Sequence, residues 1–268
     1  MPDVYSMITE VDAAVVEQLA LAMEVSAADP QHRAMVDAYL AELDPAAGTR
    51  VVEIGCGTGA IARMIAAWPG ISEVFGTDPS PILIERAREL SAGVTAVSFG
   101  EADGRDLSVP DSSFDVAVLH RVLSHAVAPS ELLAEAARVL RPGGRLVVFD
   151  GDYATITLAT GDHDPLQVCV AAMLAAFVND PWVVRRLPAM VAAAGFVEAR
   201  MQSHGFVQTH DAEYMVSIAD RGADALAASG RIGVELAGAL KAEARRRIEV
   251  GSFFGHVAYA SLLARKPA

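Results

Sequence analysis

The stretch "VVEIGCGTGA", residues 51–60, restricts the fold of this chain more than any other segment. Branched apolar residues surround the acidic residue Glu53, and glycines follow at the alternate positions 55, 57 and 59. Branched apolar residues favour a buried strand, and glycines allow the tight turn that joins a strand to a helix. Such a turn presents backbone N–H groups and the positive end of a helix to a bound nucleotide.

Short apolar strands alternate with helices through residues 45–150. The expected strands are "RVVEI", "EVFGT", "VTAVSF", "FDVAVL" and "RLVVF". The expected helices are "GAIARMIAAWPG", "SPILIERAREL" and "SELLAEAARVL". This alternation is typical of an α/β fold in which helices cover both faces of a parallel sheet.

The regions on either side of this core have different patterns. Residues 3–43 have the pattern of two amphipathic helices with a break at Ala28–Pro30. Residues 151–268 are expected to complete the sheet with the strands "VEARMQSHGFV" and "FFGHVAYASLLARK" and to insert a helical cap. Within this region, Pro188 is expected to start a helix, because proline suits the first helical turn. Gly195 is expected to end the same helix.

The charge balance bears on the partners of the chain. Its 34 acidic and 21 basic residues give a formal net charge of −13, which argues against nucleic acid. The basic cluster at residues 245–247 is interpreted as a solvated helix face. No apolar run reaches the roughly 20 residues that cross a bilayer, and the first residues do not have the pattern of a signal peptide. The two cysteines suggest neither a disulfide framework nor a metal cluster, so we expect a cytoplasmic protein without a bound metal.

A second acidic residue, Asp78, follows the expected strand "EVFGT", about 20 positions after the last glycine of the turn. In nucleotide sites, an acidic residue at this distance accepts hydrogen bonds from the ribose hydroxyls. The dinucleotide fingerprint G-x-G-x-x-G has its third glycine where this chain has Ala60. The spacing therefore favours a different nucleoside cofactor over a nicotinamide dinucleotide.

Four motifs occur in order: "VVEIGCGTG", "GTDPSPILIERAR", "GEADGRDLSVPDSSFDVAVL" and "EAARVLRPGGRLVVFD". With them the chain resembles class I S-adenosylmethionine-dependent methyltransferases, most closely the UbiE-like, or type 11, small-molecule group. The resemblance covers about residues 30–150 and part of the end. It implies a Rossmann-like fold with a seven-stranded, mostly parallel sheet, whose last strand is antiparallel. It also implies a lid in residues 1–44, a cofactor-binding core in residues 45–150, and the remaining strands with a substrate cap in residues 151–268.

The resemblance assigns one group of residues to the methionine part of S-adenosylmethionine. Gly55 and Gly57 would let the backbone approach it, and Glu53 would attract its ammonium group. His120 would line this end through its backbone. Tyr5 and Arg33 are looser candidates for closing over the cofactor and meeting its carboxylate; these two assignments complete the methionine end.

A second group is assigned to the adenosine part of the cofactor. Asp78 would bind the ribose hydroxyls, and Pro79 and Leu83 would pack on the sugar and the adenine. Asp103 would accept a hydrogen bond from the adenine amino group, with help from the backbone of Gly104. Asp106 and Asp111 lie close to Asp103 in the sequence, so an alternative register remains open here.

The acceptor requires a base if it must lose a proton before methyl transfer. His125 follows the fourth expected strand and Asp150 ends the fifth, and ligands bind at these strand ends in open α/β sheets. Some natural-product O-methyltransferases of this class use a histidine and an aspartate at matching positions, which makes this pair the first candidate. Many histidines at such positions only pack or cap a helix, and both interpretations stand at this point.

The resemblance predicts an enzyme that converts S-adenosylmethionine to S-adenosylhomocysteine while methylating an oxygen, nitrogen or carbon of a small molecule. The apolar cap favours a mostly apolar acceptor, such as a secondary metabolite or a quinone-like compound. Some proteins of this kind bind the cofactor and catalyse a cyclisation without methyl transfer, which remains an alternative. Methylation of RNA or protein fits the acidic charge less well. The sequence leaves a monomer and a homodimer equally open.

Overall fold

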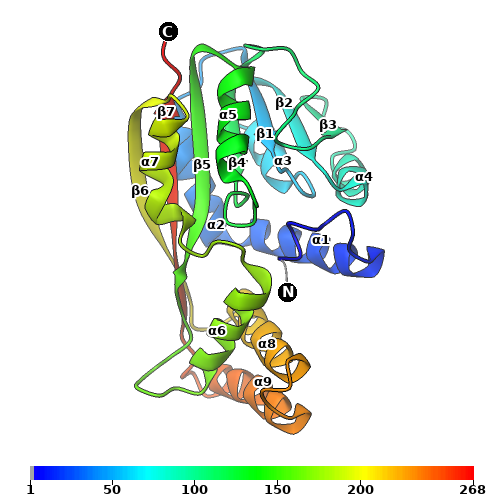
Figure 1. Ribbon diagram of the computed structural model, residues 1–268, viewed down its shortest axis with the longest axis vertical. Helices are drawn as coiled ribbons and strands as arrows, with labels where there is room; N and C mark the ends of the chain where they lie inside the picture. Colours follow the sequence, from blue (N-terminus) through cyan, green and yellow to red (C-terminus); the bar gives the residue numbers. More distant parts are fainter. Residues whose placement is uncertain (1–2) are drawn as a thin grey trace.

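The computed structural model describes residues 3–268, which contain a seven-stranded sheet in the order β3-β2-β1-β4-β5-β7-β6 (Figure 1). The first five strands pair in parallel, and β7 runs antiparallel to both of its neighbours, β5 and β6. The strands are β1 (Thr49–Ile54), β2 (Ile71–Asp78), β3 (Val97–Glu101), β4 (Phe114–His120), β5 (Leu140–Thr157), β6 (Val197–Gln208) and β7 (Gly255–Arg265). This topology confirms the predicted Rossmann-like fold with an antiparallel last strand.

The centre of the sheet is buried on both faces. Val51 of β1 lies beside Val74 of β2 and Val116 of β4, and all three side chains are fully buried. Continuous apolar strands are expected where helices cover both faces of a parallel sheet. The chain leaves β1 toward β2 on one side and β4 lies on the other, so the carboxyl ends of these strands form a switch point where ligands bind in such folds.

Five helices cover the two faces of the sheet in the described chain. The helices on one face are α2 (Pro30–Leu43), α3 (Ala60–Ala66) and α4 (Pro81–Leu90), and those on the other are α5 (Pro129–Val139) and α7 (Val183–Ala193). Pro188 lies inside α7 and does not start it, contrary to the prediction. The helix begins earlier because Val183 and Val184 are buried against the sheet, and this packing extends the helix before the proline.

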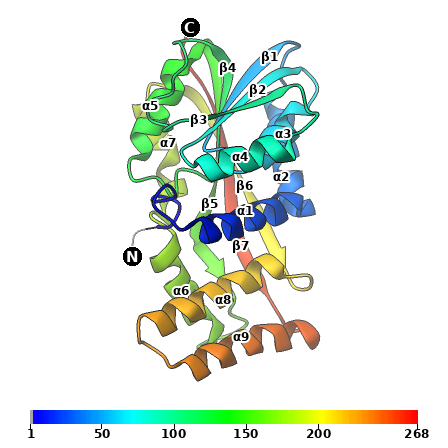
Figure 2. The same ribbon diagram turned by 90° about the vertical axis from the view of Figure 1, so that its right-hand side faces the viewer.

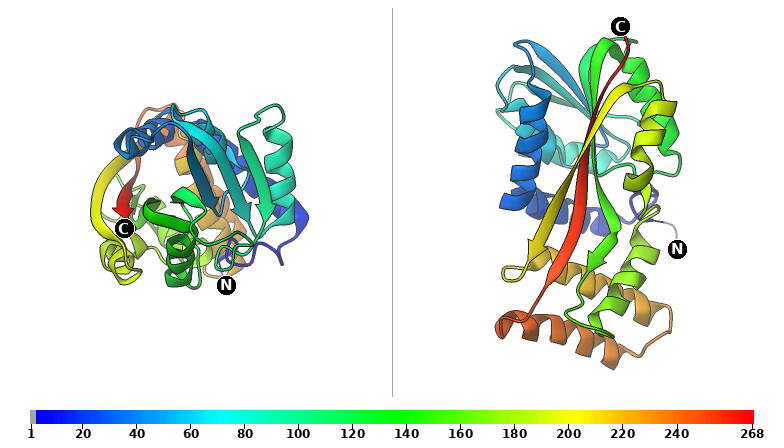
Figure 3. Two further views of the ribbon diagram at one scale, coloured as in Figure 1. Left: turned by 90° about the horizontal axis from the view of Figure 1, so that it is seen from above. Right: turned by 90° about the vertical axis from the view of Figure 1, so that its left-hand side faces the viewer.

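Strands β5, β6 and β7 continue beyond the core and carry a helical cap at their far end (Figures 2 and 3). The cap helices are α6 (Leu166–Phe177), α8 (Glu213–Ala228) and α9 (Val234–Glu249). The predicted fifth strand, "RLVVF", is only the middle of β5. The strand is longer because β7 pairs with it from Arg145 opposite Arg265 as far as Thr157 opposite His256.

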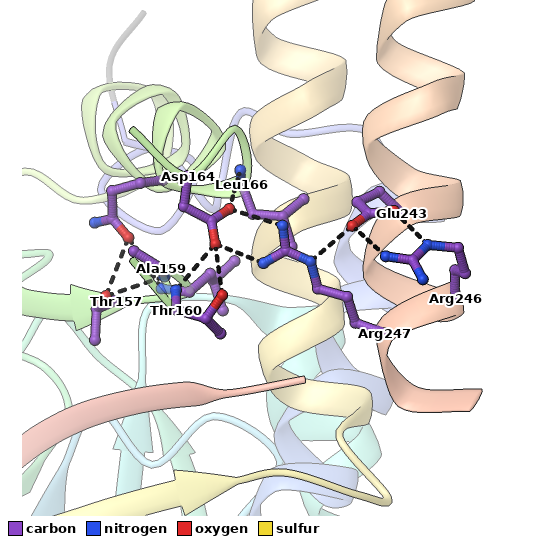
Figure 4. Close-up of polar contacts among 10 residues, drawn as sticks. Thr157, Ala159, Thr160, Asp164, Leu166, Glu243, Arg246 and Arg247 are labelled. Carbon is purple, nitrogen blue, oxygen red and sulfur yellow. Dashed lines mark hydrogen bonds and ion pairs between the residues drawn. The ribbon is translucent and has the colours of Figure 1, made fainter. Parts of the chain in front are cut away.

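The cap helices pack closely and are joined by a buried polar network. A Cβ atom on Gly222 of α8 would lie 2.0 Å from the carbonyl oxygen of Cys169 in α6, so only glycine fits at this contact. Arg247 of α9 donates hydrogen bonds to Asp164, 2.6 Å from Oδ2, and to Glu243 (Figure 4). Because Arg247 is 8% exposed, the solvated helix face predicted for residues 245–247 holds only for its neighbours, which are exposed.

The N-terminal segment lies between the core and the cap (Figure 2). Residues 4–10 form turns, and α1 (Ala13–Ala28) follows, with Asp12 accepting a hydrogen bond from the N–H of Ala14 at 2.8 Å. Asp29 caps α2 in the same way, which explains the break between the two helices. Buried residues of α1 pack against Leu83 of α4, so α1 borders the carboxyl edge of the sheet.

Candidate functional site

A cavity of about 940 Å³ opens at the carboxyl ends of β1, β2 and β4, between α1 and the cap helix α8. The N-terminal segment, the core and the cap therefore all contribute to its walls. The predicted site residues that line it are Tyr5, Glu53, Gly55, Gly57, Asp78, Pro79, Leu83, Asp103, Gly104, His120 and His125.

The glycine turn closes one end of the cavity. Gly55 and Gly57 have φ angles of +77° and +52°, which side chains rarely adopt. A Cβ atom would lie 2.6 Å from Val122 Cγ2 at Gly55 and 2.7 Å from Met23 Sδ at Gly57. The N–H of Gly55 donates to the carbonyl oxygen of Thr77 at 2.7 Å, which fixes the turn to the end of β2. The turn thus holds bare backbone at the cavity wall.

Asp78 lies buried beside this turn. Its Oδ2 accepts a hydrogen bond from the N–H of Gly57 at 2.9 Å, and its Oδ1 accepts one from the N–H of Ser80 at 3.0 Å. Burial raises its pKa to about 6, although these two hydrogen bonds act in the opposite direction. A carboxylate has about four acceptor sites, so Asp78 keeps capacity for the two hydroxyls of a ribose.

Glu53 provides the clearest test of whether the expected cofactor fits. Its side chain is 1% exposed, and its Oε2 has no hydrogen-bond partner within residues 3–268. Burial and, next, the charge of Asp78 raise its pKa to about 8. A buried polar atom without a partner is unfavourable until a ligand supplies one. The ammonium group of S-adenosylmethionine is such a donor, so the residues fit the cofactor.

Asp103 and Gly104 line the cavity just after the end of β3. The carboxylate of Asp103 is half-exposed and pairs with Arg105, with Nη2 and Oδ2 2.6 Å apart. Hydrogen bonds from Arg105 lower its pKa. A Cβ atom on Gly104 would lie 2.7 Å from Ile54 Cγ2 and 2.8 Å from Leu132 Cδ2, so the close approach of this loop requires glycine. Asp103 would have to share its carboxylate between Arg105 and the adenine.

His120 is held by aromatic neighbours at the end of β4. Its ring stacks on Phe149 with centroids 4.5 Å apart, and its Nδ1 lies 3.3 Å from the hydroxyl of Tyr39. Burial and the nearby positive charge of Arg121 lower the pKa of His120 far below its ordinary value. The imidazole is therefore neutral and fixed, which suits a structural side chain whose backbone borders the cavity.

His125 pairs with an aspartate from the N-terminal segment. Its Nδ1 lies 2.6 Å from Oδ2 of Asp3, whose side chain is 1% exposed. Asp3 also accepts hydrogen bonds from the N–H groups of Tyr5, at 2.8 Å, and Asn179, at 2.9 Å. The ring of Tyr5 lies against that of His125, with centroids 4.4 Å apart. The lid, the core and the chain after α6 therefore meet at this histidine.

Asp150 and His125 are not hydrogen-bonded to each other, although the charge of His125 acts on the carboxylate of Asp150. Asp150 is fully buried outside the cavity lining, where it accepts hydrogen bonds from the N–H groups of Ser124, at 3.0 Å, and Gly151, at 2.8 Å. Burial raises its pKa. The carboxylate thus fixes the loop that carries His125, and the histidine takes Asp3 as its hydrogen-bond partner.

Arg33 also lies outside the main cavity. It is exposed on α2 and borders a separate hollow of about 290 Å³ with Glu24 and Arg63. Within residues 3–268, no helix is both long and apolar enough to cross a membrane. In the same range, the acidic, histidine and cysteine side chains do not gather in threes as a metal site requires.

The comparisons with known proteins identify the family to which the chain belongs. A family model described as a methyltransferase domain matches residues 52–148. A demethylmenaquinone methyltransferase of Clavibacter sepedonicus is 31% identical over 182 residues, which cover 62% of this chain and 74% of that relative. The chain belongs to the S-adenosylmethionine-dependent methyltransferases. This membership confirms the predicted family, enzyme class and cofactor.

The chain spans about half the length of another relative and most of the length of a similar solved structure. An uncharacterised 37.1 kDa protein in transposon TN4556 of Streptomyces fradiae is 32% identical over 165 residues, or 61% of this chain, and the chain spans 48% of its length. Among solved structures, the [4+2]-cyclase SpnF has a TM-score of 0.56 at 24% identity, covering 88% of this methyltransferase and 81% of that chain. That likeness shows a shared fold.

Four residues at or beside the cavity of this methyltransferase were not predicted from the sequence. Asp3 precedes the recognisable helices and the motifs, so no local pattern marked it. Arg121 and Arg221 line the cavity, one directly after His120 and the other on α8, and His32 of α2 lies beside Arg121. An isolated arginine or histidine in a helix carries no spacing signal, and its position becomes clear only from the packing of α2, α8 and β4.

Proposed function

We propose that this methyltransferase methylates a small, mostly apolar acceptor at an oxygen, nitrogen or carbon atom that loses a proton to His125. The observation that carries the proposal is the cavity of about 940 Å³ between the glycine turn, the lid and the cap. Ligand sites usually measure about 300–1,000 Å³, so this volume supports binding of a cofactor together with an acceptor. The lining on the acceptor side includes Phe177 and Tyr214 of the cap.

The residues of the chain have separate tasks in this reaction. When bound, S-adenosylmethionine supplies an electrophilic methyl group on a positively charged sulfur. Glu53, Gly57 and Asp78 position it, and positioning is the main contribution a protein makes to such a displacement. Asp3 accepts hydrogen bonds only, so it favours the tautomer of His125 with a proton on Nδ1. Nε2 is then the atom that accepts the proton of the acceptor.

The N-terminal segment has a double role in this proposal. Residues 3–28 line one side of the cavity, and the same segment supplies the carboxylate of Asp3 to His125. Closure of this lid over the cofactor would therefore also orient the base. This arrangement links catalysis to exclusion of water, which strengthens electrostatic interactions in the closed site.

The test uses S-adenosylmethionine with a deuterated methyl group. The full-length protein is incubated with this cofactor and a panel of phenolic, quinone-like and amine-bearing metabolites, and products are read by mass spectrometry. We expect at least one acceptor to gain one labelled methyl group, with one S-adenosylhomocysteine formed for each product. Asp78→Ala is the matched inactive control, because it keeps the cavity but lowers the affinity for S-adenosylmethionine.

The same experiment separates methyl transfer from the cyclisation alternative. A converted substrate without S-adenosylhomocysteine would contradict the proposal and favour a rearrangement that only requires the bound cofactor. Labelled RNA or protein in place of a small molecule would contradict the proposed substrate class. The net charge of −13 supports the small-molecule interpretation over both macromolecules.

A further inference from the structure

Two arginines at the acceptor side of the cavity lack carboxylate partners within residues 3–268. Arg121 follows β4 and Arg221 lies on the cap helix α8, and both line the cavity. We propose that Arg121 and Arg221 form a subsite for a carboxylate group of the acceptor, which makes the substrate an acid. This inference rests on the proposed function and narrows its substrate class.

Arg121 is held by neutral groups. Its Nη1 donates a hydrogen bond to Ser26 Oγ at 2.8 Å, and its Nε donates to the hydroxyl of Tyr153 at 3.4 Å. Its guanidinium carbon lies 5.7 Å and 5.9 Å from the ring centroids of Tyr214 and Tyr259. Aromatic rings attract a cation, but they do not replace the bidentate hydrogen bonds that a carboxylate would accept.

Arg221, on the cap helix α8, is also surrounded by neutral groups. Its Nε donates to the carbonyl oxygen of Ser217 at 3.3 Å, within its own helix, and its guanidinium carbon lies 5.7 Å from the ring centroid of Phe177. The charges of both arginines act to lower the pKa of Tyr5, although burial dominates and raises it. Arg121 lies against the ring of Tyr214, which is two helical turns before Arg221 on α8, and Tyr5, Arg121 and Arg221 all line the cavity, which places the two guanidinium groups around the same part of it.

The acidic residues of the lining are concentrated at the opposite, cofactor end. They follow or end the strands β1, β2 and β3, and they are Glu53, Asp78, Glu101 and Asp103. The third arginine of the lining, Arg105, also lies there and pairs with Asp103. An acceptor that lies between the sulfonium group of the cofactor and Arg121 and Arg221 has positive charge on both sides. A negative group on the acceptor would therefore be stabilised there.

His32 lies beside Arg121 as a neutral, buried neighbour of the subsite. It is 4% exposed, and its Nε2 lies in a buried position without a hydrogen-bond partner in the described chain. Burial, followed by the positive charge of Arg121, lowers its pKa to about 3, so the ring is neutral. Ser26 Oγ accepts from Arg121 and lies 3.4 Å from Nδ1 of His32. Ser26 therefore links the neutral ring of His32 to the guanidinium group of Arg121.

The competing explanation is that Arg121 binds the carboxylate of the cofactor itself. Both explanations predict weaker binding of an anion when the arginine is removed, but they differ in which ligand is affected. The experiment therefore measures binding of S-adenosylhomocysteine first, and then titrates the protein saturated with it. This order also separates failure of the proposed function, seen as absent cofactor binding or absent methyl transfer, from failure of the acid subsite.

The probes are three acids and their methyl esters: cinnamate, 2-naphthoate and decanoate. Calorimetry compares the wild-type protein with Arg121→Gln and Arg221→Gln, and Arg231→Gln serves as the matched control because Arg231 is exposed and lies outside the cavity lining. We expect at least one acid to bind the wild type about tenfold or more tightly than its ester, as one charged hydrogen bond would give. Each cavity variant should reduce this preference to about threefold or less.

Three results would overturn the inference: no acid binds more tightly than its ester, the preference survives in both cavity variants, or both variants lose S-adenosylhomocysteine binding. Arg121 has a left-handed φ of +59°, so its variant is compared only after thermal unfolding shows a folded protein. Arg221→Gln keeps the test decisive if Arg121→Gln does not fold, because Arg221 is only partly buried on a cap helix. Phenyl phosphate is titrated in parallel, and tighter binding than that of every acid would reassign the subsite to phosphate.

Discussion

His125 and Asp3 form a hydrogen-bonded pair, with Nδ1 and Oδ2 2.6 Å apart, although 122 positions separate them in the sequence. The carboxylate is buried and receives two further backbone hydrogen bonds, so its position is fixed by the N-terminal segment and by Asn179. A histidine oriented in this way has one nitrogen committed to the aspartate and one available for the acceptor. The proposed base is therefore completed by the lid.

The first prediction concerns this pair. His125→Ala should lower kcat by roughly 100-fold or more, the usual contribution of a general base, and Asp3→Asn should lower it by roughly tenfold through loss of orientation. The KM for S-adenosylmethionine should change little in His125→Ala. Steady-state kinetics with the acceptor found by labelling measure both effects, and the exposed Glu10→Gln in the same segment is the control. A normal kcat in His125→Ala would return this histidine to a structural role.

The second prediction concerns the ribose contact of Asp78. Asp78→Ala should weaken S-adenosylhomocysteine binding about tenfold or more, because two ribose hydroxyls and the N–H of Gly57 lose a charged acceptor. Isothermal titration calorimetry measures the affinity. Glu73→Gln on the same strand is the control, since Glu73 pairs with Arg50 at the surface. Equal affinities for Asp78→Ala and Glu73→Gln would show that another residue binds the ribose.

The third prediction is a pH dependence that arises from Glu53, whose pKa burial and the charge of Asp78 raise from 4.5 to about 8. Between these values the folded protein binds more protons than the unfolded chain, so its free energy of unfolding falls as pH rises. Glu53→Gln removes this penalty. It should stabilise the protein by roughly 1–3 kcal/mol at pH 8 and by less at pH 5, while it weakens cofactor binding.

Urea unfolding at pH 5 and pH 8, with and without S-adenosylhomocysteine, measures both effects of Glu53→Gln. Glu73→Gln again serves as the control, because it changes an exposed carboxylate on the neighbouring strand. If Glu53→Gln changed stability equally at both pH values, ionisation of Glu53 would not be the cause. If its cofactor affinity were unchanged, Glu53 would not contact the ammonium group.

The parts of the site that sequence could predict are those encoded within a short segment. Glu53 lies near the end of one strand, Gly55 and Gly57 follow it directly, and Asp78 ends the next strand, so parallel pairing alone brings them to one edge of the sheet. The prediction that the cofactor binds at this edge followed from strand order and turn chemistry. The fold was predictable for the same reason, since short apolar strands alternate with helices along residues 45–150.

The remaining parts depend on contacts between distant segments. Asp150 was expected to be the partner of His125 because both follow adjacent strands, but its carboxylate binds the backbone of the loop that carries the histidine, and the histidine is hydrogen-bonded to Asp3. Arg33 was expected to face the cofactor, but α2 presents it to solvent. A helix pattern identifies a buried face without showing what covers it, and α1 and the cap decide which residues reach the cavity.

The last prediction tests one such distant contact, the pair between Arg247 and Asp164 in the cap (Figure 4). Both side chains are at most 10% exposed, and loss of one partner from a buried pair typically costs about 3–5 kcal/mol. Arg247→Met should therefore destabilise the protein by roughly this amount. The adjacent Arg246→Met, which breaks an exposed pair with Glu243, should cost less than about 1 kcal/mol.

The pH dependence of the destabilisation by Arg247→Met shows whether it arises from the lost charge or from the lost packing. Burial alone would raise the pKa of Asp164, but hydrogen bonds from Arg247 and from backbone N–H groups outweigh it and lower the pKa below the ordinary 3.8. The stabilisation is thus present above pH 3.8 and is lost as pH falls through the lower folded value. Urea unfolding at pH 7 and near pH 3 should show a smaller effect of Arg247→Met at the lower pH. An equal effect at both pH values would assign the loss to packing of the arginine side chain and not to its charge.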